Sequence, residues 1–350
     1  MTTLVANDET TSSRPFWKDD IAPYAQASIP RSLLDLATSA VPYLALMVTM
    51  VLMLGAGVSY WLVLLVSIPA AGFLLRTFIV FHDCTHGSFM PTKRGNHILG
   101  ATVGVLVFHP YRTWGHSHAM HHATAGDLDR RGQGDVPTLT VDEYLAHDRP
   151  MRIGYRLFRS PIVMFGLGWL WGLVIQPRMV SKDARPRLKR STWATNAVLA
   201  VLIAGLGLLI GFDTLLMVQV PTAALAGASG VFLFYVQHQF EDTYWENTGS
   251  WSYADAALRG SSYLRLPKIL QWFTGNIGLH HVHHLSAKVP NYNLQAAHDN
   301  IDLFRDVPVL SFWDGVRAAR LKVWSPRDGR LLTWAEVREY QRTLPARAVT

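Results

Sequence analysis

The chain has 350 residues, of which 49% are hydrophobic and 16% are charged, and its net charge is +7. This composition is too apolar and too poor in charge for a typical soluble protein and favours a membrane protein. The single cysteine, Cys84, excludes an intramolecular disulfide and is typical of a reducing compartment. The positive charge suits an anionic membrane surface or an acidic protein, and we expect no nucleic-acid partner because no groove-reading module is present.

Residues 1–30 are polar and predict an N-terminal arm without the apolar stretch of a signal peptide. Further along, apolar segments are long enough to cross a bilayer as helices, with short turns joining the first two and the last two. These four predicted spans are residues 39–58, 60–81, 194–212 and 215–236. The fold class is therefore predicted to be an all-α integral membrane protein, with four transmembrane helices in two hairpins.

Shorter elements are expected between and after these spans. The apolar segments 99–108 and 162–175 are too short to span and predict a half-helix or interfacial helices, and residues 141–147 predict a short helix. The membrane domain is predicted to cover residues 31–300, followed by a cytoplasmic C-terminal tail at 301–350.

The distribution of basic residues predicts the orientation in the membrane. Arginine and lysine are concentrated between Arg178 and Arg190, whereas the two hairpin turns carry neither residue. Since basic loops stay in the cytoplasm, we expect the turns outside, both termini inside and a cytoplasmic histidine-rich cap. The expected location is an integral membrane protein, in a bacterial inner membrane, with its site on the cytoplasmic side.

Histidines are concentrated in four segments that this topology places on one side of the membrane. On a helix, residues at i, i+3 and i+4 share a face, so the spacing His-x-x-His-His presents three imidazoles together. Imidazole alone does not distinguish zinc, iron, copper and nickel, but nine imidazoles overfill one four-ligand zinc site and suit two metal ions. The nine candidate ligands are His82, His86, His118, His121, His122, His238, His280, His283 and His284.

Four motifs in this order resemble the membrane fatty acid desaturase family. The similarity covers roughly residues 35–300, and it is closest to the bacterial and plastid-type acyl-lipid desaturases of the Δ12 or ω-6 type. The motifs that carry it are His-Asp-Cys-Thr-His-Gly-Ser-Phe (82–89), Trp114 through His-x-x-His-His (118–122), Gln-His-Gln-Phe-Glu-Asp-Thr-Tyr-Trp (237–245) and His-x-x-His-His (280–284).

The resemblance implies a non-haem di-iron site with two iron ions held by the histidines. It also implies O2 as the oxidant, a fatty acyl chain of a membrane lipid as substrate, and a separate electron donor, often a ferredoxin. Some relatives carry a fused cytochrome b5 domain with a His-Pro-Gly-Gly motif, but here His109-Pro110 is followed by Tyr111. The alternatives are a related di-iron hydroxylase or ketolase acting on a fatty acid, alkane or carotenoid, and, less favoured, a metal transporter, whose sites lie between spans.

Polar residues beside these motifs are candidates for orienting the ligands, since a ligating histidine usually donates its other ring N–H to a carboxylate or carbonyl. The alternative for each carboxylate is a solvated group at the interface. The extra histidines His116 and His281 are predicted to be hydrogen-bonding neighbours or solvated groups, and not ligands. The orienting candidates are Asp83, Asp127, Glu241, Asp242 and Asn276, the last of which is expected to hold a water near a metal.

Overall fold

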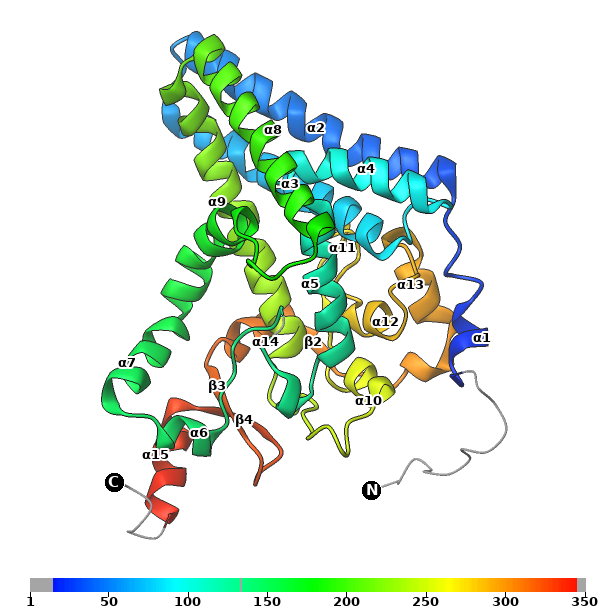
Figure 1. Ribbon diagram of the computed structural model, residues 1–350, viewed down its shortest axis with the longest axis vertical. Coiled ribbons are helices and arrows are strands. Elements are labelled where there is room, and N and C mark those ends of the chain that lie inside the picture. The colour runs from blue at the N-terminus through cyan, green and yellow to red at the C-terminus, as the bar shows by residue number, and fades with distance from the viewer. Residues whose placement is uncertain (1–14, 133, 345–350) are drawn as a thin grey trace.

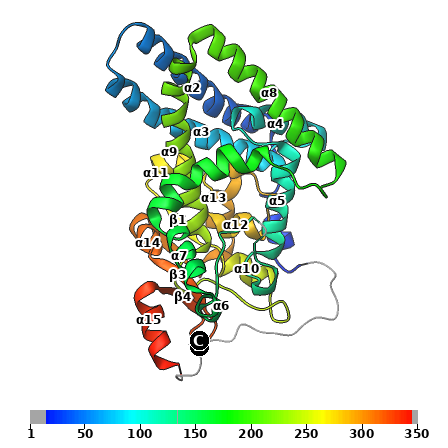
Figure 2. The ribbon, with the colours of Figure 1, turned by 60° about the vertical axis from the view of Figure 1, so that its left-hand side comes forward.

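The computed structural model describes residues 15–132 and 134–344, so residues 1–14 of the predicted arm lie outside the described part. Long helices occupy one end of the molecule, and shorter helices and strands occupy the other (Figures 1 and 2). Within the described residues, four helices are long and apolar enough to cross a membrane: α2 (Ile29–Gly55), α3 (Tyr60–His86), α8 (Pro186–Ile210) and α9 (Phe212–His238). Apolar side chains of α8 are largely exposed, as lipid-facing positions require, with Leu208 at 82% and Leu209 at 78%.

These helices form the two predicted hairpins, α2 with α3 and α8 with α9, but their ends differ from the predicted spans. The predicted spans stop where polar residues begin, whereas a helix continues as long as its backbone bonds and packing allow. Thus α3 continues past Phe81 to His86, and α9 ends at His238. The first histidine motif and His238 therefore lie on the last turns of membrane helices, whose direction fixes where these imidazoles point.

Most of the remaining elements lie beyond the ends of α3 and α9 that carry histidines, whereas α4 (Lys93–Leu106) packs alongside α3 (Figure 1). The predicted helix at 141–147 is confirmed as α6, which begins at a capping box formed by Thr140 and Glu143. The other helices are α1 (Lys18–Ile21), α4 (Lys93–Leu106), α5 (Tyr111–Thr124), α6 (Val141–Ala146), α7 (Arg149–Phe158), α10 (Tyr253–Leu258), α11 (Lys268–Phe273), α12 (His280–Leu285), α13 (Asn291–Asn300), α14 (Phe312–Ala318) and α15 (Trp334–Thr343). Strand β1 (Tyr263–Arg265) pairs in parallel with β2 (Val309–Ser311), and β3 (Leu321–Ser325) pairs antiparallel with β4 (Arg330–Thr333).

The segment after α7 is π-helical over Ile162–Leu167 and Leu170–Ile175. Helix α7 and residues Ile162–Arg178 meet at 62° and are together long and apolar enough for a broken span or a re-entrant loop. The interfacial position of 162–175 therefore stays a prediction, while the predicted helix over 99–108 lies largely within α4.

Residues 301–344, predicted as part of a tail, fold against the segment that contains α6 and α7. Val323 and Leu332 of the β3–β4 hairpin pack with Tyr144 and Tyr155 in one buried cluster. The Tyr155 hydroxyl donates to the Lys322 carbonyl oxygen over 2.8 Å. The C-terminal hairpin is thus part of the cap that encloses the inner ends of the membrane helices.

A buried lysine at this junction, next to a buried arginine, makes the stability of the junction depend on pH. Arg159 is 0% exposed, and Lys322 is 5% exposed and donates from Nζ to the Arg159 carbonyl oxygen over 2.6 Å. Burial, together with the nearby Arg159 guanidinium, lowers the pKa of Lys322 to about 8 from 10.5. Between these two values the unfolded lysine holds a proton that the folded one has released, so the stability of the junction rises with pH.

We expect the amide protection of β3 in hydrogen–deuterium exchange, corrected for intrinsic exchange rates, to increase between pH 8 and pH 10. In Lys322→Met this increase should be absent, because the methionine does not titrate. An equal increase in wild type and variant would show that another group is responsible.

Candidate metal centre

The nine predicted histidines come together in the fold, although their four helices, α3, α5, α9 and α12, lie far apart in sequence. Their nitrogen atoms form two clusters, and within each cluster the candidate ligand atoms lie within 4.8 Å of one another. The five-histidine group is His82, His86, His118, His122 and His283, and the four-histidine group is His121, His238, His280 and His284. Their role as metal ligands stays a prediction.

Each His-x-x-His-His motif is shared between the two groups. On α5, His118 and His122 belong to the five-histidine group, and His121 between them belongs to the four-histidine group. Viewed down a helix, residue i+4 is rotated by about 40° from residue i, whereas residue i+3 is rotated by about 60° in the opposite direction. On α12 the assignment is reversed: His280 and His284 belong to the four-histidine group, and His283 belongs to the five-histidine group. Helices α5 and α12 therefore each contribute to both groups.

Acceptors on the outer side of the rings fix the tautomers of three histidines. His82 Nδ1 lies 2.9 Å from Asp83 Oδ1, His121 Nδ1 contacts Asp135 Oδ1, and His238 Nδ1 lies 3.1 Å from the Gly260 carbonyl oxygen. Carbonyl oxygens and ionised carboxylates only accept hydrogen bonds, so the ring tautomer that fits these contacts carries its proton on Nδ1. Their Nε2 atoms then carry lone pairs and no proton.

These lone pairs are directed at other histidine nitrogens. His121 Nε2 lies 3.1 Å from His238 Nε2, which is a repulsive contact between two acceptors unless a cation lies between them. Several further buried ring nitrogens have no hydrogen-bond partner in the described part of the chain, which is costly without a ligand. They include His86 Nε2, His283 Nε2 and His284 Nε2. The donor set therefore fits two bound metal ions.

The environment of several of these imidazoles favours the neutral form, which is the form that binds a metal. Burial, and secondly the neighbouring imidazoles, hold the pKa of several rings well below the usual histidine value. This applies to His118, His122, His280, His283 and His284. Neutral imidazole is a ligand for iron, copper, nickel and zinc, so the site admits a transition metal without naming it.

Of the four predicted orienting carboxylates, Asp83 contacts a histidine of the two groups. Asp127 instead accepts from Arg130 Nε over 2.6 Å and from Thr248 Oγ1 over 2.9 Å. The backbone beside it is held by a bridge to Glu246, with the Leu128 N–H donating to the Glu246 carbonyl oxygen.

Glu241 and Asp242 follow the end of α9, where the chain leaves the site, and both are exposed. Glu241 pairs with Arg330 Nη1 over 3.2 Å. Asn276 has a left-handed backbone with φ of 58° and donates from Nδ2 to the Asn291 carbonyl oxygen over 3.2 Å. Within the described residues, none of these three forms a hydrogen bond or ion pair with a histidine of the two groups.

The sequence reasoning missed Asp135, which orients His121 from a glycine-rich loop. Gly134 has a φ of +77°, and a Cβ there would meet His121 Cβ at 3.2 Å and the Ser117 carbonyl oxygen at 3.2 Å. Only glycine therefore lets the loop approach α5 closely enough for the next carboxylate to reach the ring. The run Gly132 to Asp135, a carboxylate after two glycines, was the signal that could have identified it.

The extra histidines lie outside both groups, and their predicted role as neighbours and not ligands stays a prediction. His116 is exposed. His281 is buried, but its Nε2 lies 3.0 Å from His298 Nδ1 and its ring packs against Phe304. His281 thus contacts His298 and Phe304, although its sequence neighbour His280 belongs to the four-histidine group.

Comparison with known proteins identifies the family. The sequence model of the fatty acid desaturase family matches residues 59–313, which include all nine histidines. The chain is 43% identical to a fatty acid desaturase of Bacillus subtilis (strain 168) over 325 residues, 93% of this chain and 92% of the relative.

Two more distant relatives come from Synechocystis sp. (strain ATCC 27184 / PCC 6803 / Kazusa). One is an sn-1 oleoyl-lipid 12-desaturase, 24% identical over 65% of both chains. The other is an sn-1 acyl-lipid omega-3 desaturase (ferredoxin), 26% identical over 64% of this chain and 63% of the relative. The chain thus spans less than two thirds of the length of these two relatives. The match along most of its length, with the histidines in place, shows that this chain belongs to the fatty acid desaturase family and is a membrane oxidoreductase.

Proposed function

We propose that the chain is an O2-dependent di-iron desaturase that introduces a cis double bond into a fatty acyl chain of a membrane lipid. The observation that carries this proposal is the division of nine imidazoles, most of them buried, into groups of five and four with ring nitrogens directed at one another. Groups of this size suit two metal ions of five- or six-fold coordination and leave positions for O2. Two bound iron ions would supply the oxidising power needed to break an unactivated C–H bond.

The residues of the chain orient the ligands and exclude water. Asp83, Asp135 and the Gly260 carbonyl oxygen hold the rings of three ligands in one tautomer. The nine rings lie at the C-terminal ends of α3 and α9, two of the apolar helices that would cross the bilayer. An acyl chain in the bilayer would therefore have a short path to them. Burial of the site protects a strong oxidant from side reactions with water.

We propose the Δ12 or ω-6 position for the new double bond. The support comes from the name of the Synechocystis 12-desaturase, which is 24% identical. The description of the Bacillus subtilis relative gives no position. The position is therefore the part of the proposal that most needs measurement.

The deciding experiment is a fatty acid profile by gas chromatography–mass spectrometry after expression in a bacterial host that makes only saturated and monounsaturated chains. We expect a diunsaturated chain with the second double bond at Δ12, absent from a His283→Ala strain. A double bond elsewhere would retain the desaturase and refute the Δ12 position. A hydroxylated chain would instead support the related di-iron hydroxylase, and co-expression of a ferredoxin tests whether the electron donor limits the yield.

We further propose that an acidic ferredoxin delivers electrons at the cytoplasmic face of a bacterial inner membrane. The support is the basic run between Arg178 and Arg190 and the ferredoxin named for the omega-3 relative. Arg187 and Arg190 are exposed and form no ion pair within the described residues. Such unpaired charges are available to attract an acidic partner.

Neutralising both residues, as Arg187→Gln with Arg190→Gln, should raise the apparent KM for ferredoxin several-fold and leave kcat unchanged. The difference should shrink at high salt, which screens exposed charges. Arg317→Gln, an exposed cation on α14, serves as the control. An unchanged KM at low salt would reject this docking face.

A further inference from the structure

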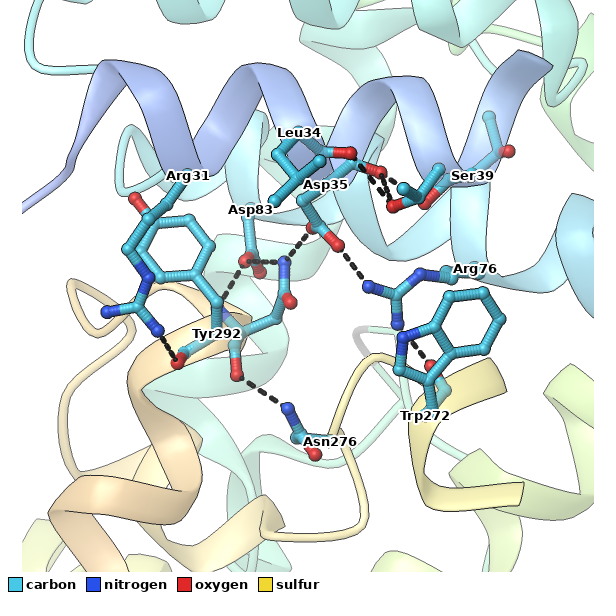
Figure 3. Close-up of polar contacts among 12 residues, drawn as sticks. Arg31, Leu34, Asp35, Ser39, Arg76, Asp83, Trp272, Asn276 and Tyr292 are labelled. Carbon is cyan, nitrogen blue, oxygen red and sulfur yellow. Dashed lines mark hydrogen bonds and ion pairs between the residues drawn. The ribbon is translucent and has the colours of Figure 1, made fainter. Parts of the chain in front are cut away.

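A series of buried polar contacts connects helix α2, which carries none of the nine histidines, to His82 of the five-histidine group. Asp35 Oδ2 accepts from the Asn291 side-chain amide over 2.9 Å, and the same amide donates to Asp83 Oδ2 over 3.1 Å. The other oxygen of Asp83 accepts from His82 Nδ1 over 2.9 Å. Figure 3 shows Asp35 and Asp83 facing each other from the two helices. All four side chains are at most 6% exposed.

Asn291, the first residue of α13, connects the two carboxylates in this series of contacts. Its amide nitrogen serves both carboxylates, and its backbone N–H donates to Asp83 Oδ2 over 2.7 Å. Its Oδ1 has no partner within the described residues. The reverse orientation of the amide would bring this oxygen against two carboxylates, so the orientation is set by charge.

At the α2 end of this series of contacts, Asp35 is held by a buried ion pair between two of the long apolar helices. The Arg76 guanidinium of α3 pairs with Asp35 Oδ1 and donates to the Trp272 carbonyl oxygen (Figure 3). The guanidinium carbon lies 4.2 Å from the centroid of the Trp272 ring. Because Arg76 holds the Asp35 carboxylate in place, this carboxylate fixes the direction in which the Asn291 side-chain amide points.

Contacts on either side hold the first turn of α13 against the start of α2. The Ser28 backbone N–H donates to the Tyr292 hydroxyl over 2.9 Å, and Arg31 Nη1 donates to Asn293 Oδ1 over 2.7 Å. These contacts place the α13 backbone, while the Asp35 contact determines which way the Asn291 amide points. The two effects can therefore be separated by mutation.

We propose that Asn291 and the Asp35–Arg76 ion pair form a positioning unit for the five-histidine group. Anchored at Asp35, the amide keeps Asp83 turned so that its other oxygen receives the His82 N–H, which directs His82 Nε2 into the group. The four-histidine group is oriented independently, through Asp135 and the Gly260 carbonyl oxygen. This inference rests on the proposed metal centre, and it assigns the positioning to a helix that supplies no ligand.

The test measures metal affinity and does not depend on turnover. Iron(II) enriched in ⁵⁷Fe is added without oxygen to the purified apoprotein, and Mössbauer spectra follow the filling of each environment. Wild type should take up two equivalents. Asn291→Leu, which has a similar size and no donor, should bind one equivalent unchanged and the other about 10- to 100-fold more weakly, as loss of an orienting partner typically does.

A second variant separates positioning from folding. Asp35→Leu with Arg76→Met removes both charges together and leaves no buried charge unpaired, so we expect the apoprotein to melt at or above the wild-type temperature. The same equivalent of iron should nevertheless bind about tenfold more weakly, because the Asn291 amide has lost its anchor. Ser39→Ala is the matched control, since Ser39 is buried one turn further along α2 and its hydroxyl donates only to the Asp35 backbone oxygen.

Wild-type affinity for both equivalents in the double variant would overturn the inference. Equal weakening of both equivalents in Asn291→Leu would also overturn it, because that result indicates general damage to the fold. A wild-type protein that takes up no iron would instead refute the proposed metal centre, so the two failures are distinguishable.

Discussion

Replacing His283 by alanine is expected to abolish desaturation and to lower the iron content of the purified protein. His283 belongs to the five-histidine group and is 1% exposed, with an unpartnered Nε2. Loss of an orienting partner already weakens metal binding about 10- to 100-fold, and loss of a ligand should cost at least as much. Because alanine leaves a gap that water can fill, the remaining histidines would also hold a less protected site.

The matched control lies two positions away on the same short helix. His281 is equally buried but contacts His298. His281→Gln retains a group that can bond to His298, and we expect it to keep two iron equivalents and most of its activity. The measurement is iron per protein, together with the diunsaturated fraction of total fatty acids. Full iron content in His283→Ala, or equal losses in both variants, would contradict the assignment of ligands on α12.

The convergence of the histidines could be predicted from sequence because its signals are local. Hydropathy predicts the four spans, and the spacing of His118, His121 and His122 predicts the shared helix face. The division of that motif between two groups could not be predicted, because spacing states which residues share a face and not what the face meets. That depends on where α3 and α9 end, and both end at a histidine beyond the predicted span.

The orienting residues were predicted less well, for a physical reason. Asp83 adjoins His82 in sequence, so proximity identified it, but proximity also suggested Asp127, which pairs with Arg130. Asn291 and Asp135 reach the groups through tertiary packing, and no periodic pattern marks them. A polar residue near a motif has several partners to choose from, whereas a histidine on a helix face has its direction fixed by the backbone.

The two groups are nevertheless built alike. Each contains one histidine whose outer nitrogen contacts a carboxylate, His82 with Asp83 and His121 with Asp135. The support of the carboxylate differs. Asp83 accepts from Asn291, whereas Asp135 lies on a loop and its Oδ2 has no partner within the described residues. Asp135 therefore acts alone, and its replacement should have the more direct effect.

Asp135→Asn is expected to weaken metal binding at the four-histidine group about 10- to 100-fold while the five-histidine group remains filled. The amide has nearly the same shape, but its NH2 group can face His121 Nδ1 and force the ring proton onto Nε2. A protonated Nε2 cannot bind a metal, so His121 would be lost as a ligand without any loss of packing.

The filling of the two iron environments with ⁵⁷Fe, followed by Mössbauer spectroscopy, measures this effect and is paired with the fatty acid profile. Asp129→Asn is the control, because Asp129 is exposed and accepts from the Thr248 backbone N–H, away from both groups. The environment lost in Asp135→Asn should be the one retained in Asn291→Leu, since the two residues support different groups. Loss of the same environment in both variants would show that the division of the nine histidines into five and four does not describe the metal centre.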